Sequence, residues 1–475
     1  MDGEKEMNRI NLIKNYINQF RKMSVELLYR RMHGRFLRAL TAAVLALGLL
    51  LSGPVSMAQG DVPELYATSA VLLDGESGKV LYGKSEETPM ANASTTKIMT
   101  CIVVLENCDI EEELTVSAYA ASMPKVKLYL NKGESYTVRQ LLYSLMLESH
   151  NDSAVALAEH VGRKWVKELS GRPASEFTEQ ESKAAVKAFA AVMNQKALEL
   201  DCADTYFITP NGLDAVETKT LEDGTEMSLE HHTTARDLAV ILSYCILRSP
   251  KKEEFLRITR QPSFSFAANG RSFTCTNHNS FLGMMEGAVS GKTGFTGKAG
   301  YCYVGALERD GRYFVVALLA CGWPNNKTYK WTDTRKLMEY GLENFHRVNL
   351  LGENVLYQEK ELPTLSVSDG QGEEIGSLCS VSLRIPGREE LTEDRGILLG
   401  DQEKIQVKIA LKNELTAPVS EGEKVGEIRY VVGDEVYRKE DIVTAGSVEK
   451  IDLKWCAKKV LELFLKGEGV LSFLV

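Results

Sequence analysis

The sequence predicts an α+β domain with helices packed on an antiparallel sheet, then a small all-β domain and a C-terminal amphipathic helix. Three observations support this fold class. Strand-like segments flank a helix-rich stretch between residues 66 and 345. Beyond Leu351, short alternating segments are separated by Gly, Asp and Asn turns. In residues 447–475, apolar residues and lysines interleave as on the two faces of a helix.

The composition is that of a globular protein. The chain has 475 residues, of which 44% are hydrophobic and 25% charged, so it can form two or three domains with a large core. The formal net charge is -9, and no basic stripe with interleaved aromatic residues occurs. Both features argue against nucleic acid as a partner.

The first 58 residues are typical of a targeting segment. Arginines precede an apolar run over residues 39–51, and Ser56-Met57-Ala58 supplies the small residues that a signal peptidase needs. The run is too short to indicate a membrane span, although an uncleaved N-terminal anchor is the alternative. We expect residues 1–58 to be a signal peptide with an extended basic N-region. The mature protein would begin near Gln59, outside the cytoplasmic membrane.

The nine cysteines are scattered, odd in number and mostly embedded in apolar runs. We therefore expect most of them to be small core residues rather than disulfide partners. No Cys/His pairs have the spacing of a metal site, so the sequence predicts no bound metal.

The elements of the first domain, expected over residues 59–350, follow from local patterns. Strands are expected at Ala67–Leu73 and Val80–Tyr82, around a Gly-rich turn. The apolar run after Ser94 fits a buried helix, and Thr137 with Gln140 forms a capping box for a helix through Leu147. Further helices are expected at 152–163, 183–200, 233–247 and 332–345, and adjacent antiparallel strands at 301–308 and 313–319.

The second domain, expected over residues 351–446, reads as β-rich. Its alternating segments are 361–367, 380–385, 404–411 and 424–432. No nucleophile, base or metal cluster stands out in it, so we expect a spacer or partner-docking role.

Residues 447–475 are expected to form an amphipathic, membrane-associating tail. An apolar face beside a lysine face is typical of a helix that lies in a membrane interface. A terminal helix packed on the β domain is the alternative. Neither this helix nor residues 470–475 are long enough to span a bilayer.

Three short motifs carry the chemistry. In chain order they are Ser94-Thr95-Thr96-Lys97, Ser149-His150-Asn151 and Lys292-Thr293-Gly294. Each occurs by chance in many proteins, but together and in this order they indicate a serine acyl-transfer enzyme of the kind that penicillin inhibits.

The motifs predict a nucleophile and its activation. If a helix begins at Ser94, Lys97 lies one turn further and its amine reaches the hydroxyl. Lysine acts as a base only if its pKa falls, which burial and a second cation, here Lys292, achieve. Ser149 would bridge the two amines and relay a proton to the leaving group. Asn151 would orient Lys97 and the substrate backbone.

The third motif predicts the binding groups. Lys292 and Thr293, on a strand beside the cleft, can hold a terminal carboxylate, and Gly294 permits close approach. The oxyanion needs two backbone donors, for which we expect the N–H groups of Ser94 and Phe295.

Simpler readings of single residues stay open at this point. Ser94 could merely cap a helix, and the Lys-Thr-Gly motif could be a surface turn. We expect His150 to point away from the relay because no carboxylate partner is apparent. His231 and His232 precede a helix N-cap and are expected to be structural rather than metal ligands.

At this point the chain resembles the serine D-alanyl-D-alanine carboxypeptidases, the low-molecular-mass penicillin-binding proteins of the penicillin-binding protein 5 type. The likeness extends over residues 62–347 and includes the segments 209–214, 232–237, 277–282 and 291–300. The resemblance implies a penicillin-binding/β-lactamase-like transpeptidase domain. It also implies that peptidoglycan stem peptides ending in D-Ala-D-Ala acylate Ser94, that terminal D-Ala leaves, and that water hydrolyses the acyl-enzyme. β-Lactams would inhibit it, no cofactor is implied, and the tail would bind the outer face of the cytoplasmic membrane.

The chain departs from the family pattern in three places. The stretch from Ser149 to Lys292 is longer, and the extra residues are expected at 164–183 and 216–229, as an additional flap. His150 stands where a small residue is commoner. Lys330 stands where the family often has an arginine near the substrate carboxylate, which makes it a candidate binding residue.

Three alternative functions remain at this stage. A class A penicillin-hydrolysing enzyme would need a Glu-x-x-x-Asn segment, which does not occur between Asn151 and Lys292. A DD-endopeptidase that cuts crosslinked peptidoglycan would use the same residues. A non-catalytic wall-binding scaffold would be expected to have lost Ser94, Lys97 or Lys292, and all three are present.

Overall fold

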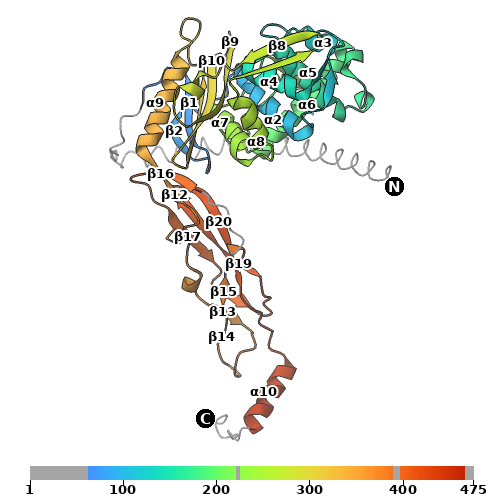
Figure 1. The fold of residues 1–475 in the computed structure, drawn as a ribbon. Helices are drawn as coiled ribbons and strands as arrows, with labels where there is room; N and C mark the ends of the chain where they lie inside the picture. Colours follow the sequence, from blue (N-terminus) through green and yellow to red (C-terminus); the bar gives the residue numbers. More distant parts are fainter. Residues whose placement is uncertain (1–62, 221–224, 353, 389–395, 466–475) are drawn as a thin grey trace. The chain divides into compact units, whose positions relative to one another are not determined.

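A computed structural model describes residues 63–220, 225–352, 354–388 and 396–465, drawn in colour in Figure 1. The expected signal peptide lies outside these residues. The described chain begins with an α+β region and continues into short β-sheets and a final helix, as the sequence predicts.

The central sheet of the first region is antiparallel and has the strand order β2-β1-β11-β10-β9. Its two expected strand pairs are confirmed, and β9 forms one edge. The strands are β1 (Ser69–Asp74), β2 (Val80–Lys84), β9 (Ala288–Thr296), β10 (Gly300–Arg309) and β11 (Arg312–Leu319).

Both faces of this sheet are buried. Along β1, Val71 and Leu73 pack into one hydrophobic cluster, whereas Ala70 and Leu72 pack into another, because successive side chains point to opposite faces. Helix α7 (Ala235–Ser243) contacts the strands on one side, and α9 (Tyr329–Asn344) contacts β10 and β11 as well. Apolar residues in consecutive positions of β1 are therefore required by the fold.

Helices fill the stretch between β2 and β9 (Figure 1). The expected helices are all present, and the capping box of Thr137 and Gln140 forms in both directions. The main elements are α2 (Lys97–Asn107), α4 (Val138–Tyr143), α5 (Asn151–Gly162) and α6 (Glu179–Glu199), with the π-helical turns η2 (Ser144–Glu148) and η6 (Tyr244–Arg248).

The sequence did not single out several short elements. These are α3 (Ala118–Ala121), α8 (Lys252–Arg260) and the hairpins β3–β4 (Glu113–Thr115, Ser135–Thr137) and β7–β8 (Ser263–Ala268, Arg271–Thr276). Strand β8 lies against the helical part of the domain and carries Arg271, which belongs to a polar network beside the cleft.

The two segments with expected extra residues have different structures. Residues 163–178 form the 3-10 turns η3 (Arg163–Trp165), η4 (Lys167–Leu169) and η5 (Ala174–Glu176), with a small hydrophobic cluster of their own. In the other segment, the strands β5 (Val216–Thr220) and β6 (Glu226–Glu230) pair antiparallel.

The second region is all-β around its own core, which includes Leu365, Ile428 and Tyr430. Its strand β12 (Phe345–Asn349) precedes the expected boundary at residue 350 but pairs with β16 (Gly396–Gly400). The other strands are β13 (Leu365–Ser368), β14 (Cys379–Val381), β15 (Leu383–Arg384), β17 (Gln406–Leu411), β18 (Leu415–Thr416), β19 (Lys424–Val432) and β20 (Glu435–Thr444). Glu361, the first residue of one expected strand, belongs to the 3-10 turn η8 (Glu359–Glu361) instead.

The last described element is α10 (Leu453–Leu465), within the expected amphipathic tail. Leu453, Phe464 and Leu465 are strongly exposed on it. No helix in the described part of the chain combines the length and hydropathy that a bilayer crossing requires.

All nine cysteines are free thiols, and six of them are buried. Burial raises the pKa of Cys302 and of Cys275 to about 12. The expectation that most cysteines are small core residues is confirmed.

Candidate active site

The Ser-x-x-Lys motif spans a 3-10 turn and the start of a helix. Ser94 lies in η1 (Ala93–Thr96), and Lys97 is the first residue of α2. The side-chain amide of Asn92 donates hydrogen bonds to the hydroxyls of Thr95 and Thr96, which holds the turn. The Nζ of Lys97 lies 2.7 Å from the Oγ of Ser94.

Lys97 is fully buried, and its hydrogen bonds fit a neutral amine. Its Nζ lies 3.0 Å from Oδ1 of Asn151 and 2.6 Å from the carbonyl oxygen of Asn211. A neutral amine has two N–H donors for these two acceptors, and its lone pair then faces the Ser94 hydroxyl. Burial, reinforced by the charge of Lys292 and opposed by Asp152, lowers the pKa of Lys97 well below its ordinary value.

The backbone of Asn211 reaches Lys97 because a glycine follows it. Gly212 has a φ of +77°, and a Cβ there would lie 1.9 Å from the carbonyl oxygen of Ala93. Only glycine permits this approach between the loop and the nucleophile turn. The sequence placed Asn211 and Gly212 in a family segment without assigning a role to either residue.

Ser149 lies at the end of the π-helical turn η2, in the left-handed region at a φ of 64°. Its Oγ lies 2.9 Å from the Nζ of Lys292. Lys292 is buried on β9, and this burial lowers its pKa to about 7. Ser149 is thus hydrogen-bonded to Lys292, whereas the bonds of Lys97 go to Ser94, Asn151 and Asn211 rather than to a bridging Ser149.

The edge of β9 presents backbone groups beside Ser94. Tyr301 of β10 lies opposite Phe295. The N–H of Tyr301 donates to the carbonyl of residue 322, and its C=O accepts from the N–H of residue 321, so neither group bonds to Phe295. Phe295 and Tyr301 therefore form a non-hydrogen-bonded pair, and the N–H of Phe295 points away from β10, along the open edge. A Cβ on Gly294 would lie 3.0 Å from the backbone nitrogen of Ser94, so the two N–H groups expected to bind an oxyanion are neighbours.

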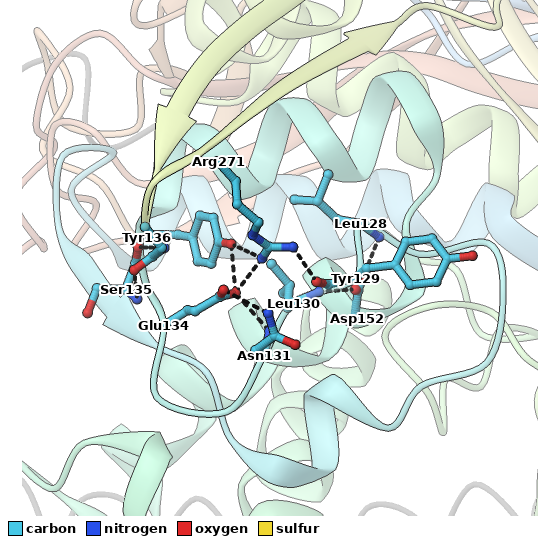
Figure 2. A network of polar contacts seen from close by, with 10 residues as sticks. Leu128, Tyr129, Leu130, Asn131, Glu134, Ser135, Tyr136, Asp152 and Arg271 are labelled. Atoms are coloured by element: carbon cyan, nitrogen blue, oxygen red, sulfur yellow. Dashed lines mark hydrogen bonds and ion pairs between the residues drawn. The ribbon is translucent and has the colours of Figure 1, made fainter.

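A polar network supports Asn151 from the helical side of the cleft. The backbone N–H of Asn151 donates to the carbonyl of Val126 at 2.8 Å, and its side chain donates to that of Pro124. Figure 2 shows the next residue, Asp152, whose carboxylate accepts hydrogen bonds from the N–H groups of Leu128 and Leu130.

The outer part of this network is closed by Arg271 of β8. Figure 2 shows its guanidinium donating to the carbonyl of Tyr129 at 3.0 Å and to Glu134 and Tyr136. Loop 124–136 and α5 are thereby held in one position, which fixes the side chain of Asn151.

These groups surround a cleft of about 560 Å³. Ser94, Ser149, Asn151, Thr293, Gly294, Phe295 and Lys330 line it, whereas Lys97 and Lys292 are buried and reach it through Ser94 and Ser149. Of residues 164–183 and 216–229, those that the structure describes do not line this cleft, so this part of the expected additional flap does not belong to the cleft wall.

Lys330 lies on α9 and is largely buried. Its Nζ donates to the carbonyl of Lys327 and lies 4.7 and 4.8 Å from the ring centroids of Tyr301 and Trp331. Burial lowers its pKa. The aromatic rings hold the ammonium at the cleft wall.

Sequence reasoning missed several lining residues. One of them, Lys125, lies in loop 124–136. Two others, Glu148 and His278, form a pair with 2.8 Å between Oε2 and Nε2. No local sequence pattern predicts this pair, because His278 and Glu148 are 130 positions apart and only the fold brings them together.

Two histidines are placed as expected. His150 hydrogen-bonds through Nδ1 to the Oγ of Ser144 at 2.8 Å. His231 accepts from the N–H of Ile208 and bonds through Nε2 to Thr96 at 2.9 Å. Burial lowers the pKa of His231 to about 3, so its neutral ring braces the nucleophile turn.

Comparison with protein families decides the assignment. The family described as D-alanyl-D-alanine carboxypeptidase matches residues 56–167 and 180–320, and the penicillin-binding protein 5 C-terminal domain matches 397–450. The chain belongs to the D-alanyl-D-alanine carboxypeptidase family. The interruption at 168–179 lies inside one of the segments where the sequence predicted extra residues.

Individual relatives agree with this membership. D-alanyl-D-alanine carboxypeptidase DacF of Bacillus subtilis is 26% identical over 86% of this chain and 96% of its own length. DacD of Escherichia coli is 28% identical over 81% of this chain and 88% of its own. The structure of penicillin-binding protein 5 from Haemophilus influenzae has the same fold, with a TM-score of 0.57, 22% identity, and coverage of 82% of this chain and 99% of that one.

The chain is therefore a serine-type D-alanyl-D-alanine carboxypeptidase, a hydrolase of the penicillin-binding class with peptidoglycan peptides as substrates. The fold prediction, a transpeptidase-type domain followed by a small all-β domain, is confirmed.

Proposed function

We propose that this carboxypeptidase removes the terminal D-Ala of peptidoglycan stem peptides through an acyl-enzyme on Ser94. The hydrogen-bond pattern of Lys97 carries the proposal. Its two N–H groups are occupied by Asn151 and Asn211, which aims the lone pair at the Ser94 hydroxyl 2.7 Å away.

In acylation, Ser94 Oγ attacks the carbonyl carbon between the two D-Ala residues while its proton passes to Lys97. The negative charge on the carbonyl oxygen is stabilised by the N–H groups of Ser94 and Phe295. The C–N bond then breaks, and the proton that Lys97 accepted passes through the Ser149 hydroxyl to the departing amine, so that Lys97 is neutral again. Lys292 holds the Ser149 hydroxyl in place.

In deacylation, a water adds to the acyl carbon and gives its proton to Lys97. The bond from the acyl carbon to Ser94 Oγ then breaks, Ser94 Oγ takes the proton back from Lys97, and the free enzyme is restored. A β-lactam acylates Ser94 by the same attack, but its leaving amine stays attached to the acyl group and remains in the cleft. This is the basis on which we expect β-lactams to inhibit the enzyme.

The substrate would lie along the open edge of β9. Non-hydrogen-bonded pairs alternate along β9 and β10, so the backbone N–H and C=O groups of Thr293 point the same way as those of Phe295, and the C=O of Thr293 accepts a hydrogen bond from Lys292. A peptide can add to such an edge as a further strand. Its terminal carboxylate would bind the hydroxyl of Thr293 and the ammonium group of Lys330. Lys292, buried behind Ser149, would attract the carboxylate when it carries a proton.

We also infer an extracytoplasmic enzyme held at the membrane by residues 447–475. The support is the exposed apolar side chains of α10, including Leu453, Phe464 and Leu465. Cosedimentation with anionic lipid vesicles tests this, and equal recovery of a Phe464→Glu variant with the vesicles would contradict it.

The catalytic proposal is tested by D-Ala release from a synthetic peptide ending in Lys-D-Ala-D-Ala. We expect Ser94→Ala to lose release by at least about 10⁴-fold, since the nucleophile is removed. Ser122→Ala, at an exposed serine outside the cleft, is the matched control and should retain full activity. Equal release by the wild type and Ser94→Ala would remove Ser94 from the mechanism.

A further inference from the structure

A second cluster of chemically active side chains lies away from the cleft. Cys108 follows the last residue of α2, Glu112 lies in the next loop, and His160 lies in the last turn of α5. The Sγ of Cys108, a carboxylate oxygen of Glu112 and a ring nitrogen of His160 all lie within 4.8 Å of one another. We propose that these three side chains bind a Zn²⁺ ion.

The cluster lies at the opposite ends of the two helices that carry catalytic groups. Helix α2 begins at Lys97 and α5 begins at Asn151, whereas Cys108 and His160 lie at their C-terminal ends. An ion here would tie together the two helices whose other ends place the base and its amide partner.

The loop that holds Glu112 is already ordered. The Oε1 of Glu112 accepts a hydrogen bond from the N–H of Asp109 at 2.8 Å, and the backbone carbonyl of Glu112 accepts one from the N–H of Val138 at 2.9 Å. The other oxygen, Oε2, is thereby turned toward His160, 2.9 Å from Nε2. Two ligand atoms are thus in place before any ion arrives.

Binding of the ion would deprotonate the Cys108 thiol, and that proton would be released to solvent.

A positive charge already occupies this position. The Nζ of Lys164 lies 2.9 Å from the carbonyl oxygen of Asn107, 3.6 Å from the Sγ of Cys108 and 3.7 Å from Oε2 of Glu112. The ends of α2 and α5 both present helix C-terminal dipoles, which favour a cation. The side chain of Lys164 is 38% exposed, so it can turn into solvent when an ion displaces it.

Thiolate, imidazole and carboxylate together are typical zinc ligands. Zinc–ligand distances of about 2.0–2.3 Å place ligand atoms roughly 3–4 Å apart, so the present separations need only a small closure. The thiolate and the carboxylate neutralise the two charges of the ion, and a water completes the tetrahedron. The sequence expectation of no metal rested on local spacing, whereas His160 is 48 positions from Glu112.

The test is a calorimetric Zn²⁺ titration of the full chain after dialysis against a chelator. We expect one equivalent to bind, a loss of affinity of about 10-fold or more in Cys108→Ser, and a rise in Tm with Zn²⁺. Cys379→Ser, at another partly buried thiol in the β domain, is the matched control and should bind as the wild type does.

The most decisive measurement is the Zn²⁺ affinity of Lys164→Met. Because it removes the resident ammonium, it should bind Zn²⁺ more tightly than the wild type, while Lys132→Met, at an exposed lysine, should not. Equal affinity of the wild type and Cys108→Ser would overturn the proposal. So would the absence of binding in both the wild type and Lys164→Met, and so would unchanged affinity in Lys164→Met.

Discussion

Two buried charged clusters, one in each domain, are treated differently by the fold. In the peptidase domain, Lys97 and Lys292 bond to hydroxyl, amide and carbonyl groups. In the β domain, the buried carboxylate of Glu440 accepts hydrogen bonds from Arg388, Arg438 and the hydroxyl of Tyr430.

The two clusters differ in whether the pKa shifts favour the neutral or the charged form of the buried group. Burial lowers the pKa of Lys97 and Lys292, which favours their neutral forms. Burial also opposes the charge of Glu440, but Arg388, Tyr430 and Arg438 outweigh it and hold its pKa below the ordinary value. A buried charge with matched partners supports structure, whereas buried amines without them are held ready to exchange a proton.

The largest effect is expected from Lys97→Met, which keeps the volume but removes the base. D-Ala release should fall by about 10²–10⁴-fold, because a positioned base contributes about that much. In the wild type, release should rise with pH from the acid side as Lys97 loses its proton. Wild-type-like release by Lys97→Met would show that another group takes the Ser94 proton.

Glu440→Gln should be the next largest. Removing the charge leaves Arg388 and Arg438 beside an uncompensated buried site, which costs about 3 kcal/mol or more of β-domain stability. Urea unfolding followed by circular dichroism measures this, with the exposed Glu414→Gln as control. D-Ala release should be retained, and a stability change no larger than the control's would erase the contrast between the clusters.

Lys292→Met should have the opposite effect on stability. The folded pKa of about 7 lies below the unfolded value of about 10.4, so the unfolded chain binds more protons between these values and wild-type stability rises with pH across this window. The variant should therefore unfold at higher urea than the wild type at pH 7, with the gap narrowing toward pH 10. Its D-Ala release should fall. A gap that does not depend on pH would mean that Lys292 is not deprotonated in this window.

The smallest effect is expected from Lys330→Met. The residue lies at the cleft wall, away from the Ser94 hydroxyl contacts, so a role in holding the substrate carboxylate predicts a KM increase of about 10-fold with little change in kcat. Lys330→Arg should keep KM near the wild-type value. An equal fall in kcat for both variants would place Lys330 in the chemical step instead.

Local patterns predicted those parts of the site that depend on spacing along one element. Lys97 follows Ser94 by one helical turn, and Lys292 and Thr293 lie on a strand, so sequence alone places them. The left-handed backbone of Ser149 and the carbonyl of Asn211 depend on distant segments meeting. A backbone carbonyl has no sequence signature. The only related feature in the sequence is the glycine at position 212, whose positive φ allows the carbonyl of Asn211 to approach Lys97.

The same limit explains what was missed elsewhere. The capping box of Thr137 was readable because both partners lie within one turn. The pairing of Glu148 with His278 and the grouping of Cys108, Glu112 and His160 required helices and strands to be packed first. The hairpin β7–β8 is different, because its residues alternate and its turn is Asn269-Gly270, so its signal was present in the sequence and was overlooked.

The free thiols have a consequence for how this enzyme is made. A protein held together by core packing, with six sealed cysteines and no cross-link among all nine, needs no oxidase or isomerase to mature. Its native state contains no disulfide that must form, so the chain can reach that state in a reducing compartment.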